Sequence, residues 1–458
     1  MVTNEKDRVR ETIYAQRDQF IRITHDLHDH PELAFCEEFA AARITEFLKE
    51  QGFTVQKGIC GLPTAFVASY GHGSLHIAFC AEYDALPPAC LFDRSKPTEL
   101  VEVWLTPEPS DPQDPPDAPV RHACGHNIIA AASVAAAVGL RDIADEIGMT
   151  ISVFGTPGEE LYGIPEPRDG RLAPGKILLL ERGAFAGIHA VLMVHPFPTP
   201  WSVIIPTHVC ARLRAQFSKT GTGSQGMRTP ELKRLEEALK KVILSFHQMP
   251  GLYVARPEDH CAGAQAEIMW VAQHLADSPP VVAAVRRPIE EAASAAGVTV
   301  QIQEYAPGAN MRHDPKLSDS FRKNSEVLGR IRAKDETIQA EIREVFSSPK
   351  LPLPVRLLAR SFPHLFSPSG LFMSKFPVKI VYGTDLANVS QVIPAIHPYI
   401  GIGGTHGPHM AEFADDVETA EAYRAMLDGG IALAWTALNA ATDSTLREYL
   451  LQVASTKR

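Results

Sequence analysis

The sequence lacks two features that would place it in a special class of protein. No apolar run approaches the roughly 20 residues that a membrane-spanning helix requires. There is no long run of Lys and Arg, and the net charge of −10, with a pI near 6.0, comes from dispersed acids. This charge argues against binding to nucleic acid or to a membrane surface. The sequence therefore predicts a soluble globular protein whose partners are small molecules.

The cysteines also lack the pattern of a disulfide framework, because the seven Cys are odd in number and irregularly spaced. The chain begins without the basic segment and apolar segment of a secretory signal. Both observations favour a reducing cytoplasm as the location of the protein.

The chain has enough residues for two domains, or for one large domain with another inserted into it. It contains 458 residues, of which 45% are hydrophobic. Apolar periodicity predicts helices up to about Leu27 and over 39–51, 128–140, 317–331 and 419–438. Short apolar runs predict strands over 64–70, 75–80, 150–154, 190–194, 378–382 and 396–403. Residues 88–120 are rich in Pro and Asp and predict an exposed insertion without a core, while residues 335–377 match no element.

The middle of the chain predicts a second domain. We expect strands over 209–217 and 298–302, an apolar stretch over 266–271, and helices over 230–247 and 280–296. Two β-α-β passes of this length are typical of a ferredoxin-like fold. The predicted domains are residues 1–206 and 311–458, which form one body, and an inserted domain over 207–310.

One stretch of the first body concentrates potential metal ligands. Cys124 and the imidazoles of His122 and His126 lie within five residues, at a junction where a loop meets an alanine-rich helix. Backbone N–H groups are free at such a helix start, and thiol and imidazole are ligands for zinc. From this stretch alone, a buried Cys beside two surface histidines remains an alternative.

Polar side chains also follow three of the predicted strands. Asp84 follows the strand 75–80, Glu159 and Glu160 follow 150–154, and His195 follows 190–194. In an open α/β sheet, ligands bind at the edge where the strands end, so these side chains are expected to meet. Two adjacent acids on a surface loop are common, however, and the Glu pair alone would not define a site.

The motifs as a set, in their order, resemble the two-metal amidohydrolases and metallopeptidases that include aminoacylase and hippurate hydrolase. The motifs are His-Pro-Glu-Leu (30–33), Ala-Glu-Tyr-Asp-Ala-Leu-Pro (81–87), His-Ala-Cys-Gly-His-Asn (122–127), Thr-Pro-Gly-Glu-Glu (156–160), His-Pro (195–196) and His-Met-Ala-Glu-Phe (409–413). Asn127, with Thr-Asp-Leu-Ala-Asn-Val-Ser (384–390), resembles the branch of p-aminobenzoyl-glutamate hydrolase and β-alanyl-lysine dipeptidase. The resemblance implies a zinc-peptidase-like α/β catalytic domain with a central mixed sheet, an inserted ferredoxin-like α+β domain that serves as lid and dimerisation domain, and a homodimer or higher oligomer.

The resemblance also implies roles for single residues. Five ligands would hold two divalent ions, zinc or manganese: Cys124, His126, Glu160, His195 and His409. Cys124 would bridge the two ions, and His409 is preferred to His406 because the family pattern has a His three residues before Glu-Phe. Glu159 would act as general base toward a metal-activated water, and Asp84 would orient a ligand.

The predicted function is therefore metal-dependent hydrolysis of a small amide bond, in an N-acyl amino acid or a dipeptide-like substrate. One departure favours an alternative, a non-catalytic or weakly active relative that uses the metal site for binding. The family has a His in its lid that helps to hold the substrate, whereas residues 218–226 contain none. A metal-free thiol amidase, with Cys124 as nucleophile and His126 or His122 as base, would leave the two Glu without a role.

Overall fold

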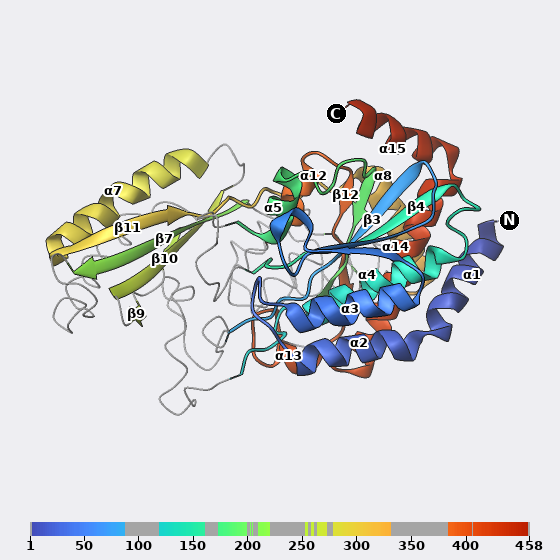
Figure 1. The fold of residues 1–458 in the computed structure, drawn as a ribbon, viewed down its shortest axis with the longest axis horizontal. Helices are drawn as coiled ribbons and strands as arrows, with labels where there is room; N and C mark the ends of the chain where they lie inside the picture. Colours follow the sequence, from blue (N-terminus) through green and yellow to red (C-terminus); the bar gives the residue numbers. More distant parts are fainter. Residues whose placement is uncertain are drawn as a thin grey trace, which may run out of the picture.

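The structure is a computed structural model, and Figure 1 shows a larger body and a second, smaller sheet beside it. The described residues are 2–87, 119–160, 173–198, 202, 204, 209–219, 252–254, 258–260, 263–272, 278–330, 383–404 and 406–456. The predicted helix 230–247, the predicted strand 378–382, the segment 220–226, the insertion 335–377 and nearly all of the insertion 88–120 lie outside them. Among the described helices, none is long and apolar enough to cross a membrane.

A mixed six-stranded sheet forms the centre of the larger body, as predicted. In spatial order its strands are β1 (Thr54–Lys57), β2 (Phe66–Tyr70), β4 (Met149–Gly155), β3 (Leu75–Ala81), β5 (Ala190–Leu192) and β12 (Ala395–Ile396). The pairs β1–β2 and β2–β4 are antiparallel, and β4, β3, β5 and β12 run parallel to one another. The carboxyl ends of these four parallel strands therefore meet at one edge of the sheet.

Two predicted strands are shorter than expected because their pairing is interrupted. The strand predicted over 190–194 ends at Leu192, and the chain pairs again as β6 (His195–Phe197), parallel to β13 (Tyr399–Gly401). The strand predicted over 396–403 is divided in the same way between β12 and β13. Pro196 and Pro398 have no N–H and cannot donate to the ladder at this point. His195 is consequently the first residue of a short strand rather than the residue after one.

Helices cover the sheet (Figure 1). They are α1 (Val2–Ala15), α2 (Arg17–Asp29), α3 (Glu38–Glu50), the 3₁₀ turn η1 (Ile59–Gly61), α4 (His126–Arg141), α5 (Gly175–Glu181), α8 (Pro315–Val327), α12 (Leu386–Ser390), α13 (Phe413–Asp416), α14 (Ala420–Thr442) and α15 (Ser444–Thr456). The predicted first helix is thus two helices. The predicted helix 317–331 ends at Val327, before Gly329, which has a φ of +72°.

The alanine-rich helix α4 lies at the centre of this body. Every residue from His126 to Leu140 is buried, and α4 packs against β3, α2 and α14. Small side chains let the helices approach closely, since a Cβ on Gly430 of α14 would lie 3.0 Å from the Ala132 carbonyl oxygen. The helix begins at His126, two residues before the predicted start, so His126 lies in its first turn and Cys124 just before it.

A second sheet lies apart from the larger body in Figure 1. Its antiparallel strands run in the order β11 (Val298–Glu304), β7 (Val209–Lys219), β10 (Gly263–Ala272) and β8 (Leu252–Val254), and β9 (Glu258–His260) also pairs with β10. Helix α7 (Ser278–Ala296) packs against β11 and β7. The last strand lies beside the first, as a ferredoxin-like fold requires. The exact domain boundaries and the role of this sheet as a lid remain predictions.

Candidate metal centre and active site

The candidate ligands of the larger body meet where the parallel strands end. Their nitrogen, sulfur and oxygen atoms form two groups of three, in each of which the atoms lie within 4.8 Å of one another. Cys124, His126 and His195 make the first group, and Cys124, Glu160 and His409 the second. Both groups contain Cys124, and a ligand that bridges two ions would have to belong to both.

A glycine makes the junction between Cys124 and α4 possible. Gly125 has a φ of +77°, and a Cβ at this residue would lie 2.5 Å from Pro196 Cγ. Only glycine is free of both penalties, the left-handed backbone and the steric overlap. The thiol of Cys124 and the imidazole of His126 can therefore stand beside the strand that carries His195.

The two histidines of the first group are oriented by hydrogen bonds at Nδ1. His126 Nδ1 lies 2.9 Å from Asp84 Oδ1, and His195 Nδ1 lies 2.8 Å from the carbonyl oxygen of Pro196. The Nε2 atoms are left to face the site. His195 Nε2 lies 3.3 Å from Cys124 Sγ, and the buried His126 Nε2 has no hydrogen-bond partner in the described part of the chain. Such Nδ1 contacts are the usual way in which proteins orient histidine ligands.

The second group depends on a strained loop residue. His409 has a φ of +67°, its backbone N–H donates to the Ala123 carbonyl oxygen at 2.8 Å, and its Nε2 lies 3.0 Å from Glu160 Oε1. A left-handed backbone is uncommon for a residue other than glycine and often marks a functional position. His406 instead pairs with Asp416, at 3.0 Å. The geometry thus favours His409 over His406 as a ligand, in line with the sequence prediction.

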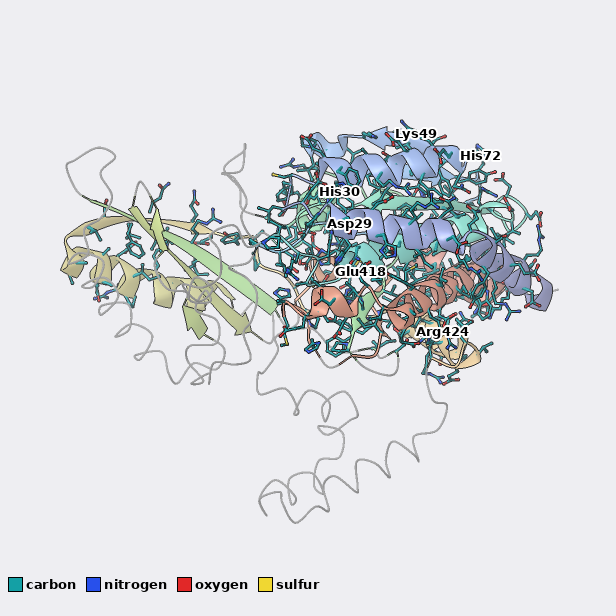
Figure 2. The ribbon with its side chains drawn as sticks, turned by 90° about the horizontal axis from the view of Figure 1, so that it is seen from below. Asp29, His30, Lys49, His72, Glu418 and Arg424 are labelled. Atoms are coloured by element: carbon teal, nitrogen blue, oxygen red, sulfur yellow. The ribbon has the colours of Figure 1, made fainter. Side chains whose placement is uncertain are left out.

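Asn127 connects the start of α4 to a neighbouring segment of the chain. Its amide Nδ2 donates to Glu418 Oε1 at 3.1 Å, and Glu418 also lies 2.6 Å from His25 Nδ1 of α2. Figure 2 shows Glu418 near Asp29, at the same end of α2. An Asp at position 127 would place a second carboxylate against Glu418, whereas the Asn amide ties the start of α4 to it.

The charged and buried groups of the centre shift the pKa values of its residues in different directions. Burial disfavours a charged His126, but the Asp84 carboxylate, the Cys124 thiol and the Glu82 carboxylate outweigh burial and raise the pKa of His126 well above its usual value. Removal from water, together with the carboxylates of Glu160 and its neighbours, raises the pKa of Glu159 well above its ordinary range. Burial acts in the opposite direction on the other histidine of the first group and lowers the pKa of His195 to about 4.

Three buried residues near Glu159 were not predicted as site residues. Lys176 Nζ contacts Glu82 Oε1 at 2.5 Å and Asp385 Oδ1 at 2.6 Å, and all three side chains are at least 98% buried. The ligand atoms of Glu82, Glu159 and Asp385 form a cluster that could bind a cation. The Lys176 ammonium supplies that positive charge instead. Glu82 and Asp385 lie within motifs that the sequence analysis quoted, whereas nothing in the sequence singles out Lys176.

The residues of the centre fit two divalent ions. A thiol, two oriented imidazoles with free Nε2 atoms, a buried carboxylate and a third imidazole are ligand types that zinc accepts, and the carboxylate and imidazole also suit manganese. The buried Nε2 of His126 makes no hydrogen bond within the described residues and lies 3.5 Å from Glu82 Oε2 and 3.8 Å from Glu160 Oε1. Glu159 lies within 4.8 Å of both His126 and Glu160, although neither three-residue group around Cys124 includes it.

Sequence comparison finds named relatives of the chain, although no family model matches it. The chain is 30% identical over 236 residues to a component of the p-aminobenzoyl-glutamate hydrolase of Escherichia coli, a match that covers 51% of this chain and only 43% of that protein. It is 25% identical over 462 residues to the Xaa-Arg dipeptidase of Mus musculus, which covers 95% of this chain and 88% of the dipeptidase.

Comparison with solved structures finds the same fold. An aminobenzoyl-glutamate utilization protein from Klebsiella pneumoniae superimposes with a TM-score of 0.54 at 11% identity, over 93% of this chain and 98% of its own. A dinuclear metal-binding peptidase of the M20 family from Bacillus subtilis superimposes with a TM-score of 0.50 at 18% identity, over 91% and 98% of the two chains.

Proposed function

We propose that the chain hydrolyses a small amide bond with the help of two divalent metal ions. Its named relatives include p-aminobenzoyl-glutamate hydrolase and Xaa-Arg dipeptidase, and its fold is similar to that of an M20-family dinuclear metal-binding peptidase. The proposed substrate is an N-acyl amino acid or a dipeptide-like molecule. The names of its relatives support this class, because p-aminobenzoyl-glutamate and Xaa-Arg dipeptides both contain an amide bond to the nitrogen of an amino acid.

One observation carries the proposal, namely that Cys124 belongs to both groups of ligand atoms while Glu159 lies beside them. Five side chains would then hold the two ions: Cys124, His126, Glu160, His195 and His409. This arrangement leaves Glu159 free for acid–base chemistry. A metal-free thiol amidase would need the same Cys124 as a nucleophile, and burial raises the pKa of the Cys124 thiol well above its usual value, which disfavours a thiolate nucleophile in the absence of a cation.

In this proposal each residue of the chain has a stated task. Two divalent ions, when bound, would lower the pKa of the attacking water and stabilise the oxyanion that forms. Glu159 would accept a proton from the attacking water and then pass it to the nitrogen of the leaving amine. Asp84 would hold His126 at Nδ1, and so keep Nε2 directed at the ligand group.

The experiment that tests the proposal combines metal analysis with a substrate panel. Purified protein would be analysed for metal content, and hydrolysis of p-aminobenzoyl-glutamate, hippurate, N-acyl amino acids, β-alanyl dipeptides and Xaa-Arg dipeptides would be followed before and after chelation. Two ions per chain, with turnover that chelation abolishes and metal restores, is the expected result. Protein without metal would refute the metal centre. Two ions without turnover on any substrate would favour the alternative of a binding protein.

A further inference from the structure

Glu37 is a buried carboxylate with no part in the metal centre. It lies at the turn between α2 and α3, and its side chain is fully buried. Its Oε1 accepts hydrogen bonds from the backbone N–H groups of Phe35 and Gly158, both at 2.8 Å, and its Oε2 accepts one from Thr64 Oγ1 at 2.8 Å. Three donors on one buried side chain make Glu37 a fixed junction between distant parts of the chain.

Capping of the neighbouring helix does not account for Glu37. It is the N-cap residue of α3, yet its carboxylate makes no capping hydrogen bond to that helix. Glu32 performs this task, because its two oxygens accept from the N–H groups of Phe39 and Ala40 at 2.9 Å. The Glu37 side chain instead points away from α3, to the loop that carries Glu159.

The two peptide N–H groups on either side of Glu159 are both held by buried carboxylates. Gly158 N–H donates to Glu37, and Glu160 N–H donates to Asp84 Oδ2 at 2.9 Å. The two acceptors come from different segments, one between α2 and α3 and the other after β3. Glu159 therefore projects from a short piece of backbone that is fixed at both ends.

Steric contacts fix the same loop from the side of Glu37. Gly158 has a φ of +63°, and a Cβ at this residue would lie 2.6 Å from the ring of Phe35. Phe35 itself has a φ of +62°, an uncommon conformation for an aromatic residue. The hydrogen bond from Phe35 N–H to Glu37 helps to hold this conformation, so Glu37 supports the Glu159 loop both directly and through the ring that packs on Gly158.

We propose that Glu37 is a positioning residue for Glu159: it holds the loop 156–160 so that the Glu159 carboxylate stands at a fixed place beside the metal ligands. The inference rests on the proposed function, in which Glu159 moves the proton. The positional role needs only a hydrogen-bond acceptor at Oε1, and therefore does not depend on a negative charge at Glu37. A displacement of about 1 Å in a reacting group can reduce a rate by about 100-fold.

The test compares three variants. Glu37→Ala removes the acceptor, and Glu37→Gln keeps an oxygen at Oε1. Glu32→Ala is the control, because it removes a partly buried acceptor of two N–H groups that belong to α3 instead. Amide hydrogen exchange over 156–160 measures how firmly the loop is held. kcat, KM and metal content are measured on the same metal-loaded preparations.

We expect the amides of residues 156–160 to exchange faster in Glu37→Ala than in the wild type, and kcat to fall by about 100-fold, with KM and metal content little changed. Glu37→Gln and Glu32→Ala should stay close to the wild type in exchange rate and in kcat. Equal losses in Glu37→Ala and Glu37→Gln, unchanged kcat in Glu37→Ala, or a loss that added metal restores would overturn the proposal. If Glu37→Ala does not fold, Thr64→Val, which removes the donor to Oε2, should give the same pattern to a smaller extent.

The exchange measurement separates this inference from the proposed function. If the wild-type protein hydrolyses no substrate on the panel, the proposed function fails, but the exchange rates of the variants still decide whether Glu37 holds the loop. Exchange over 156–160 that is equal in the wild type and Glu37→Ala would overturn the positional role whatever the activity.

Discussion

At the scale of single residues, Glu159 carries the most specific prediction. Glu159→Gln keeps the size and one oxygen of the side chain but removes its ability to accept a proton, so turnover should fall by about 10²- to 10⁴-fold. In the proposed assignment Glu159 is not a ligand, although its oxygen lies within 4.8 Å of ligand atoms of His126 and Glu160, so metal content should stay at the wild-type value. Steady-state kinetics and elemental analysis of the same preparation check both parts.

The matched control is Glu146→Gln, since Glu146 is an exposed carboxylate paired with Arg8 on the surface. This variant should keep both turnover and metal. A Glu159→Gln protein that retains turnover would remove Glu159 from the role of general base, and one that loses metal would make it a ligand.

Glu37 gives the folded protein a predictable dependence on pH. Burial, together with the Asp84 carboxylate, raises the pKa of Glu37 from 4.5 to about 8. Between these two values the folded state binds a proton that the unfolded state releases, so this contribution to stability decreases as the pH rises. Glu37→Gln does not titrate, and its stability relative to the wild type should therefore increase from about pH 4.5 to about pH 8 and level off above. Chemical denaturation of both proteins across this range checks the sign, which a constant difference would contradict.

At the scale of secondary-structure elements, the start of α4 is the most sensitive point. Gly125→Ala adds a Cβ that would lie 2.5 Å from Pro196 Cγ, beside the His195 ligand, so we expect metal content to fall. Gly187→Ala is the matched control, because Gly187 has a φ of +80° but has no atom within 4 Å of the added Cβ. It should carry only the backbone strain, about 1 to 2 kcal/mol. Equal metal loss in both variants would mean that strain, and not the contact with Pro196, is the cause.

Lys176 connects three elements through buried ion pairs. It lies on α5 and contacts Glu82 after β3 and Asp385 before α12. Lys176→Met leaves two buried carboxylates without their cation and should lower the free energy of unfolding by about 3 to 5 kcal/mol. Arg287→Met, which breaks an exposed pair with Glu291 on α7, should produce no measurable change. Denaturant titration of the two variants compares these effects, and equal small losses would contradict the structural role of Lys176.

How well each element was predicted depended on whether its determinants are local. The parallel strands β3 and β4 and the helix α4 were predicted to within two residues, because unbroken apolar or alanine-rich runs mark them. The break between β5 and β6 was not predicted, since it comes from pairing with a segment that contains Pro398, some 200 residues away. Helix α5 carries buried Lys176, whose burial depends on long-range ion pairs that no local pattern indicates.

In the candidate site, too, the residues marked by local sequence patterns were predicted and those that depend on distant contacts were not. The polar residues at strand ends, Asp84, Glu159 and Glu160, come together as expected because β3 and β4 are adjacent and parallel. The named relatives also confirm the family resemblance of the motifs. Glu37 and Lys176 could not be predicted, because their importance comes from what they touch in three dimensions. The assignment of the five metal ligands remains a prediction.

At the scale of the whole molecule, metal binding and folding should be coupled. The proposed ligands extend from Cys124 to His409, so an intact site exists only in the folded chain, and ions that bind only there stabilise that state. Chelation should therefore lower the melting temperature, and added zinc or manganese should restore it. Thermal denaturation with and without chelator measures the shift. An identical melting temperature in both conditions would mean that the ions contribute nothing to stability.

The order of the ligands along the chain has a consequence for synthesis of the protein. The first group is complete in sequence once His195 has been made, but the second awaits His409, more than 200 residues later. At about 5 to 20 residues per second, this interval lasts on the order of ten seconds or more. During that time Cys124 and Glu160 exist without one of their proposed partners. With the proposed ligands, a ribosome-bound chain would therefore acquire at most part of its metal, and the second ion would enter after translation is nearly finished.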